Sequence, residues 1–446
     1  MRDFTTGSIS KPLVAFAAPM VVGNLVQQLY SMADAMIVGR FVGGGALAAV
    51  GVSMNVIMFL VATLIGLTTG SAIVIAQFFG AKQQEKLKAT VSVSIIFLAG
   101  LAVIISVCGV ILAPGILRLL RTSSDVIDEA VVYMRIILSA TLAPIFYNMY
   151  NAYLRALGDT KRPLYILIFT VILNVILDLW FVIGLKLGVK GAAIATIISQ
   201  MFSAVLCFTY ARRSVPLLMV KKLAFDGKLF RLILRYGIPA ALQMSFVSLA
   251  TLTITRLINS FGSEALAAIT AVNRIDQFVN MPIATLSAAM STFVAQNMGA
   301  GLEDRARKGF RTALMYMIGC AVFMSVVLMV FAPQLISLFL NKGDASAPEI
   351  LRIGRSYMHI MVIFYFIFAI MFAFNGFFRG VGDAVMAMVF PVISLTIRTI
   401  SAYMLIGYAG MGPEALAWSV PIGWSLSSLG SFVYYKKRLW VGKVVT

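Results

Sequence analysis

Residues 76–81 read AQFFGA, and residues 295–300 read AQNMGA. Two further pairs of motifs follow the same order: GALAAV at 45–50 with EALAAI at 264–269, and LRALGD at 154–159 with FRGVGD at 378–383. The first two pairs share one offset, and chance recurrence of short apolar motifs does not produce three matches in one order. The second half of the chain therefore repeats the first.

The composition is typical of a membrane protein. Of 446 residues, 61% are hydrophobic and 12% are charged, against about 25% charged in soluble domains. Apolar windows of about 20 residues, each enough to cross roughly 30 Å of hydrocarbon, recur along the chain. We predict twelve spans: about 13–36, 46–70, 90–113, 130–152, 163–184, 190–210, 231–258, 265–297, 310–332, 353–375, 385–407 and 415–435.

The repeat divides these spans into six and six. We predict an all-α membrane protein of twelve transmembrane helices in two pseudo-symmetric six-helix bundles, residues 1–212 and 230–446. A basic cytoplasmic linker, residues 213–229, joins them. Because six is even, both repeats have the same orientation, and transporters of this kind hold substrate near the midplane between their halves.

The net charge of +19 is explained by topology. With the N-terminus inside, 24 of the 36 Lys and Arg residues fall in predicted cytoplasmic segments, as the positive-inside rule requires. The first apolar run is too long for a signal peptide, so we expect it to remain as a helix. We therefore predict a multi-pass cell-membrane protein with both termini cytoplasmic, and no nucleic-acid partner.

Three acidic residues lie inside predicted spans: Asp34, Asp178 and Asp276. A carboxylate in hydrocarbon costs at least a few kcal/mol and usually faces a water-filled cavity or an ion pathway. Asp34, Asp178 and Thr196 each fall roughly 8–10 Å below the predicted outer boundary, at 1.5 Å per residue. Asn174 lies four residues before Asp178, on the same helix face.

These oxygen-bearing side chains suit a hard cation such as Na⁺, and without it two neighbouring carboxylates would share a proton. The sequence leaves H⁺ and Na⁺ open as the bound cation. The alternative is that Asp34 and Asp178 are polar packing residues without a role in ion binding.

The motifs together resemble the multidrug and toxic compound extrusion (MATE) transporters, and Asp34 with Asn174-x-x-x-Asp178 resembles their prokaryotic DinF-like branch. The resemblance implies that Asp34, Asn174, Asp178 and Thr196 form a cation or proton site and that Pro19 lets the first helix bend. The second half does not duplicate this set: Arg398 stands opposite Asn174, and could be a fixed charge where the ion sits in the other half.

A polar stripe lies on the eighth predicted span, at Asn273, Asp276, Gln277 and Asn280. Such side chains must face protein or water and not lipid. We expect them in a substrate cavity, with Asp276 attracting a cationic solute; alternatively, Asp276 is neutralised by Arg274. Gln27 and Asn151 are weaker candidates for the same cavity.

These observations predict a secondary antiporter that exports organic, cationic or amphipathic solutes of multidrug type in exchange for H⁺ or Na⁺. Alternatives are a lipid-linked oligosaccharide flippase of the same superfamily and, less favoured, a channel or a membrane enzyme. The sequence has no phosphate-binding loop, Ser-His-Asp set or metal cluster. We therefore expect no enzyme activity and no cofactor, an organic solute and the bilayer as partners, and a monomer.

Overall fold

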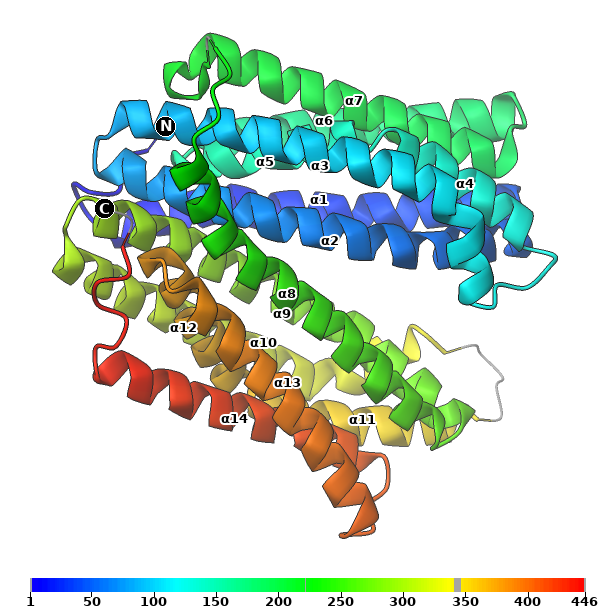
Figure 1. The fold of residues 1–446 in the computed structure, drawn as a ribbon. Coiled ribbons are helices and arrows are strands. Elements are labelled where there is room, and N and C mark those ends of the chain that lie inside the picture. Colours follow the sequence, from blue (N-terminus) through cyan, green and yellow to red (C-terminus); the bar gives the residue numbers. More distant parts are fainter. Residues whose placement is uncertain (1, 221, 341–345, 445–446) are drawn as a thin grey trace. The chain divides into compact units, whose positions relative to one another are not determined.

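The computed structural model describes residues 2–220, 222–340 and 346–444, which fold into helices and short connections (Figure 1). The α-helices are α1 (Ser10–Phe41), α2 (Gly44–Gly80), α3 (Gln84–Leu119), α4 (Ile127–Ser139), α5 (Leu142–Ala156), α6 (Lys161–Asp178), α7 (Gly188–Ser214), α8 (Gly227–Asn259), α9 (Ser263–Gly299), α10 (Glu303–Ser337), α11 (Ala347–Ile363), α12 (Tyr365–Val381), α13 (Ala384–Gly407) and α14 (Glu414–Lys436). A π-helical segment, η1 (Leu179–Gly184), follows α6, and a 3₁₀ turn, η2 (Pro216–Leu218), follows α7.

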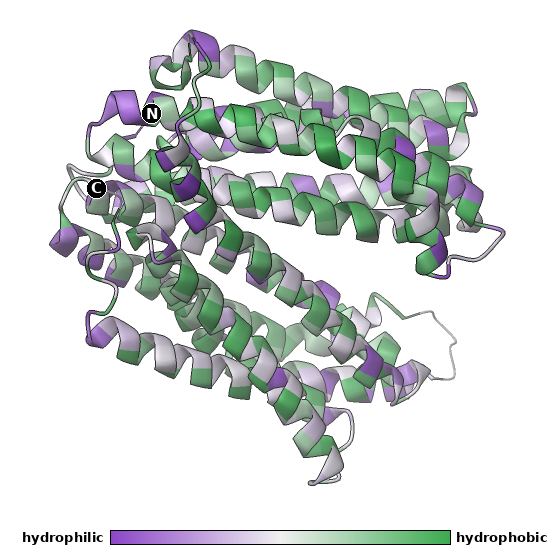
Figure 2. Cartoon of the chain, in the orientation of Figure 1, coloured by the Kyte–Doolittle hydropathy of each residue, from purple (hydrophilic) through white to green (hydrophobic). Residues whose placement is uncertain are grey.

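The helices have the length and composition of membrane spans. Within the described residues, nine are long and apolar enough to cross a membrane, and the bent pairs α4–α5 and α11–α12 raise the number to eleven. The twelfth predicted span coincides with α14, which is less apolar because its 23 residues include five serines. Apolar residues cover the middle of most helices, and hydrophilic residues gather towards the ends (Figure 2). The predicted all-helical membrane fold is confirmed.

The chain forms two compact units. One consists of Met1–Asp3 and Ala15–Ala241, and the other of Phe4–Val14 and Leu242–Thr446. The first part of α8 belongs to the first unit because its backbone lies against α2: a Cβ atom built on Gly70 would be 2.4 Å from the backbone nitrogen of Gly237. Small residues allow such close helix approach in membranes. The predicted linker at residues 213–229 stays a prediction.

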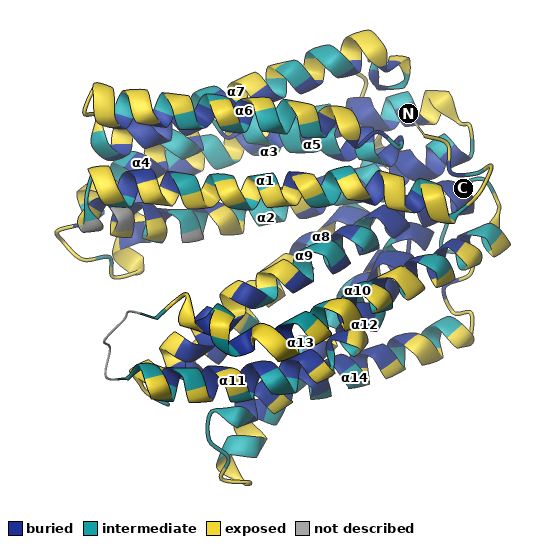
Figure 3. Ribbon diagram, turned by 180° about the vertical axis from the view of Figure 1, so that it is seen from behind, coloured by how far each residue is buried: buried dark blue, intermediate teal, exposed yellow. Residues whose placement is uncertain are grey.

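The helices repeat as the motifs do. The first half, α1–α7, corresponds in order to the second half, α8–α14, and α2 and α9 each have 37 residues. Exposed apolar side chains at Ile104 and Val107 of α3 have counterparts in Phe323 and Val326 of α10, at the offset that relates Ala76 to Ala295. Buried residues line the inner sides of the helices within each unit, while exposed residues line the outer sides (Figure 3).

Two predicted spans, 130–152 and 353–375, are broken and not continuous as expected. The axes of α4 and α5 differ by 51°, and those of α11 and α12 by 54°. Each break frees a carbonyl group, which must find another donor in hydrocarbon. Ser106 donates to the Ser139 carbonyl at 3.1 Å, and Ser325 donates to the Val362 carbonyl at 2.6 Å. Donors on neighbouring helices therefore support both breaks.

The Arg-x-x-Gly-Asp motifs form turns after α5 and α12. Gly382 has φ +94°, a left-handed conformation that glycine adopts without strain. Asp383 Oδ1 accepts a hydrogen bond from the backbone of Met386 and caps α13. Its other oxygen accepts from the Tyr434 hydroxyl. The motif is therefore a helix-capping turn.

Pro19 lies inside α1. Proline has no N–H to donate, so the carbonyl group of Ala15 loses its helical partner, which weakens the helix locally. One residue further along, the Phe16 carbonyl accepts a hydrogen bond from the Thr160 hydroxyl at 3.0 Å. The start of α1 is thereby fastened to the start of α6, on the side of Pro19 away from Asp34.

Candidate cation site and polar clusters

The four predicted cation-site residues lie on three helices of one unit. Asp34 is on α1, Asn174 and Asp178 are on α6, and Thr196 is on α7. All four side chains are buried, and none is more than 7% exposed. The carboxyl groups of Asp34 and Asp178 interact electrostatically with each other. The fold therefore joins two acids that lie far apart in the sequence.

Most polar atoms of this cluster have no hydrogen-bond partner among the described residues. These atoms are Asp34 Oδ1, both oxygens of Asp178, and the oxygen and nitrogen of the Asn174 amide. Buried polar atoms are nearly always paired, so such a group points to a proton, an ion or water. Two neighbouring ionised carboxylates repel each other, and a shared proton or a small cation between them removes the repulsion.

Two tyrosines outside the predicted site border the carboxylates. Tyr30 lies one turn before Asp34 on α1, and its hydroxyl lies beside the Thr196 side chain. Tyr133, on α4, is 1% exposed and interacts electrostatically with both acids. The four-residue spacing from Tyr30 to Asp34 is a signal that could have been used. No local pattern marks Tyr133.

Asp178 is the last residue of α6 and directly precedes η1. π-Helical turns are rare and often occur at functional sites. Here the turn changes the helical repeat immediately after the acid. It spans Leu179–Gly184, the last six residues of the predicted span 163–184.

The second half contains a different polar cluster around Asp276 of α9. Oδ1 accepts a hydrogen bond from the Tyr365 hydroxyl, and Oδ2 accepts one from the Asn280 amide, each at 2.6 Å. Arg398 of α13 interacts electrostatically with Asp276 and lies beside the Tyr357 hydroxyl. Both oxygens of this acid therefore have protein donors, in contrast to Asp34 and Asp178.

The model of a known protein family matches both repeats. The family model MatE matches residues 19–180 and 239–404, one segment in each half. The chain belongs to the MATE family. Its members are transporters, so the protein is a membrane transporter and not an enzyme.

The MATE protein has relatives along its whole length. It is 32% identical to YoeA of Bacillus subtilis, over 98% of this chain and 96% of YoeA. It is 29% identical to YpnP of the same organism, over 98% and 97%. Among solved structures, "Crystal structure of MATE in complex with MaL6" matches with a TM-score of 0.91 and 24% identity, covering 98% of each chain. That likeness supports the fold alone.

The predicted substrate-cavity residues of this MATE protein fall into two groups. Asn273 and Gln277 are exposed on α9. Asp276 and Asn280 are half-buried, and the Asn280 amide donates a hydrogen bond to Asp276. The basic group that interacts with Asp276 is Arg398 and not Arg274, because residues two apart on a helix point to different sides.

The two weaker candidates also differ. Gln27 is exposed on α1. Asn151 is half-buried, and its amide donates to the Tyr147 hydroxyl at 3.4 Å.

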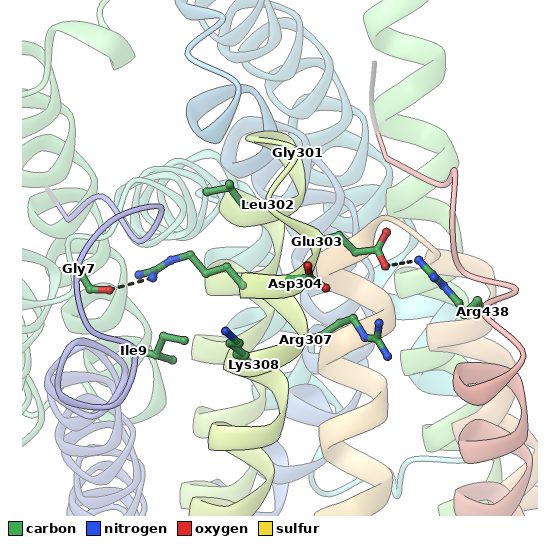
Figure 4. A pocket seen from close by; sticks show the side chains of 10 residues that line it. Gly7, Ile9, Gly301, Leu302, Glu303, Asp304, Arg307, Lys308 and Arg438 are labelled. Atoms are coloured by element: carbon green, nitrogen blue, oxygen red, sulfur yellow. Dashed lines mark hydrogen bonds and ion pairs between the residues drawn. The ribbon is translucent and has the colours of Figure 1, made fainter.

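A cavity of about 720 Å³ lies at the start of α10, where the N-terminal segment is anchored (Figure 4). Arg305 donates to the backbone carbonyls of Phe4, Thr6 and Gly7 at 2.7–3.0 Å. Gln296, from the AQNMGA motif, accepts a hydrogen bond from the Phe4 N–H at 3.0 Å. The motif therefore has a structural role that its sequence did not reveal.

Proposed function

We propose that this MATE protein is a secondary antiporter that exports organic, cationic or amphipathic solutes in exchange for inward H⁺ or Na⁺. The relatives YoeA and YpnP are each named "Probable multidrug resistance protein", which supports a multidrug-type substrate range. The observation that carries the proposal is the buried pair Asp34 and Asp178, whose carboxyl groups face each other without protein donors for three of their four oxygens.

The coupling cation binds at Asp34, Asn174, Asp178 and Thr196 in this proposal. The two carboxylates supply negative charge, and the Asn174 oxygen supplies a neutral ligand. The Thr196 hydroxyl donates its proton to the Ala192 carbonyl at 2.9 Å, so the lone pairs of the hydroxyl oxygen remain available to bind a cation. Oxygen ligands of this kind suit Na⁺, and the same carboxylates can hold a proton.

Cation binding drives transport only if the cation prefers one conformation over the other. Asp34 and Asp178 lie on different helices, so neutralising their charges favours the arrangement in which α1 and α6 are close at this level. Pro19 weakens α1 between its fastened start and Asp34, which makes it the bending point. The moving bodies in this proposal are the halves 1–212 and 230–446, joined by residues 213–229. Residues 230–241 at the start of α8 move with the first half, and residues 4–14 move with the second, because each segment packs in that unit.

The same proposal includes the setting of the protein. Both termini lie in the cytoplasm, because most basic residues outside the spans fall on that side. The chain acts as a monomer in the cell membrane, and no cofactor takes part. H⁺ or Na⁺ is the only inorganic partner.

The test is transport by purified protein in proteoliposomes that contain a DNA-bound ethidium reporter. We expect ethidium uptake to require an imposed pH or Na⁺ gradient. The Asp34→Asn variant should lose this gradient-driven uptake. Asp125→Asn, an exposed acid near the start of α4, is the matched control and should transport normally. Unchanged gradient-driven transport by Asp34→Asn would exclude this site. Transport of lipid-linked oligosaccharide without ethidium transport would favour the flippase.

A further inference from the structure

The cluster around Arg398 occupies the place in the second half that the candidate cation site occupies in the first. The offset that relates Asp159 to Asp383 also relates Asn174 to Arg398 and Tyr133 to Tyr357. The helices agree with this relation, because α6 corresponds to α13 and α4 to α11. A tyrosine from the broken fourth span therefore borders both clusters.

The charges of the two clusters differ. In the first half, the groups that interact with Asp34 and Asp178 are each other and neighbouring tyrosines, with no basic side chain among the described residues. In the second half, a single carboxylate, Asp276, interacts with the guanidinium of Arg398. Counted with ionised carboxylates, the first cluster carries two negative charges and the second carries none.

Packing holds Arg398 in this position. A Cβ atom built on Gly423 of α14 would lie 2.5 Å from the Ser394 carbonyl oxygen and 3.3 Å from the Arg398 Cβ, so α14 covers this part of α13 closely. Arg398 Nε is buried and has no hydrogen-bond partner among the described residues. Arg398 as a whole is half-buried, and a guanidinium in a membrane helix is costly unless a negative charge compensates it.

The helix break between α11 and α12 supplies the rest of the cluster. Tyr365 is the first residue of α12 after the break, and its hydroxyl donates to Asp276. Tyr357 lies on α11 before the break and borders Arg398. Residues on both sides of the break therefore contact the Asp276 and Arg398 pair.

We propose that Arg398 is a built-in counter-charge that takes the place of a transported cation in the second half, so that each molecule binds one coupling cation and not two. This inference rests on the proposed function, because it concerns the number of cations that the antiporter uses. Arg398 then permanently supplies the positive charge that balances Asp276, whereas a cation from solution supplies the positive charge at Asp34 and Asp178.

The test compares cation binding by the wild type, Arg398→Gln, Arg398→Lys and the double variant Asp276→Asn/Arg398→Gln. Binding is measured with radioactive Na⁺ and, for protons, with a pH indicator during a pH jump, on purified protein in detergent. We expect one cation for the wild type and for Arg398→Lys, which keeps the charge. Arg398→Gln leaves Asp276 uncompensated and should bind two, and the double variant should return to one.

The failure of this inference is distinguishable from failure of the proposed function. One cation in Arg398→Gln, or two in the double variant, overturns the inference and leaves the antiporter intact. Asp34→Asn added to Arg398→Gln should retain one cation, at Asp276. If Arg398→Gln does not fold, the inference requires that the double variant folds, since both charges of the pair are then absent. A double variant that is equally unfolded also overturns it.

Discussion

The Tyr434 hydroxyl donates a hydrogen bond to Asp383 Oδ2 at a distance of 2.6 Å, although the two residues are 51 positions apart in the sequence. Tyr210 makes the same contact with Asp159 over 2.8 Å at the same separation. In each half, the last helix thus holds the turn that caps the helix before it. The paired turns are a structural consequence of the repeat.

Removing this hydroxyl should destabilise the fold. In Tyr434→Phe the oxygen of buried Asp383 loses its donor, and we expect a loss of about 1 to 3 kcal/mol in the free energy of unfolding. Tyr210→Phe should lose a similar amount. Denaturant unfolding in detergent measures both, with Tyr408→Phe, which is 91% exposed, as control. Equal stability of all three variants would show that these hydrogen bonds do not hold the turns.

The Tyr30 hydroxyl should contribute to cation binding. Tyr30 lies beside Thr196 and close to Asp34, so Tyr30→Phe removes a hydrogen-bonding group from the candidate site without changing its charge. We expect about a 2- to 10-fold weaker apparent affinity for the driving cation, the equivalent of one hydrogen bond, with the maximal transport rate retained. Transport rate against cation concentration tests this. An unchanged affinity would place Tyr30 outside the site.

Asp276→Asn should alter substrate preference more than cation dependence. The substitution leaves the charge of Arg398 uncompensated, and this positive charge disfavours a cationic solute nearby. We expect ethidium transport to fall relative to that of an uncharged amphipathic dye, while the gradient requirement persists. Competition between the two dyes in proteoliposomes measures the effect. If the variant instead loses its gradient requirement, the coupling site lies around Asp276.

The contact between α2 and α8 should not tolerate a side chain at Gly70. A Cβ atom there would be 2.4 Å from the Gly237 nitrogen and 2.6 Å from its Cα. Because both atoms belong to the backbone, the helices must separate, at a cost of about 1 to 3 kcal/mol. Gly51→Ala, in the same helix with nothing within 4 Å of the added atom, should keep its stability. Thermal unfolding of both variants measures the difference in stability. If Gly70→Ala is as stable as Gly51→Ala, the two helices can separate without cost and the prediction is wrong.

Much of the fold could be predicted because hydrocarbon imposes local rules. A span must be apolar over about 20 residues and must pair its own backbone groups, so the spans and the repeat can be recognised in the linear sequence. The helix breaks at Ser139 and Ile363 could not be recognised, because the donors that support them, Ser106 and Ser325, come from other helices.

The candidate site divides in the same way. Sequence alone determined that Asp34, Asp178 and Asp276 are costly acids in apolar helices, since that cost depends on each residue and its neighbours along the chain. Only the tertiary structure decided that Asp34 and Asp178 interact, and that Asp276 accepts a hydrogen bond from Tyr365 and interacts electrostatically with Arg398. Electrostatic pairing depends on distance in space, and packing brings together side chains from helices that are remote in the sequence.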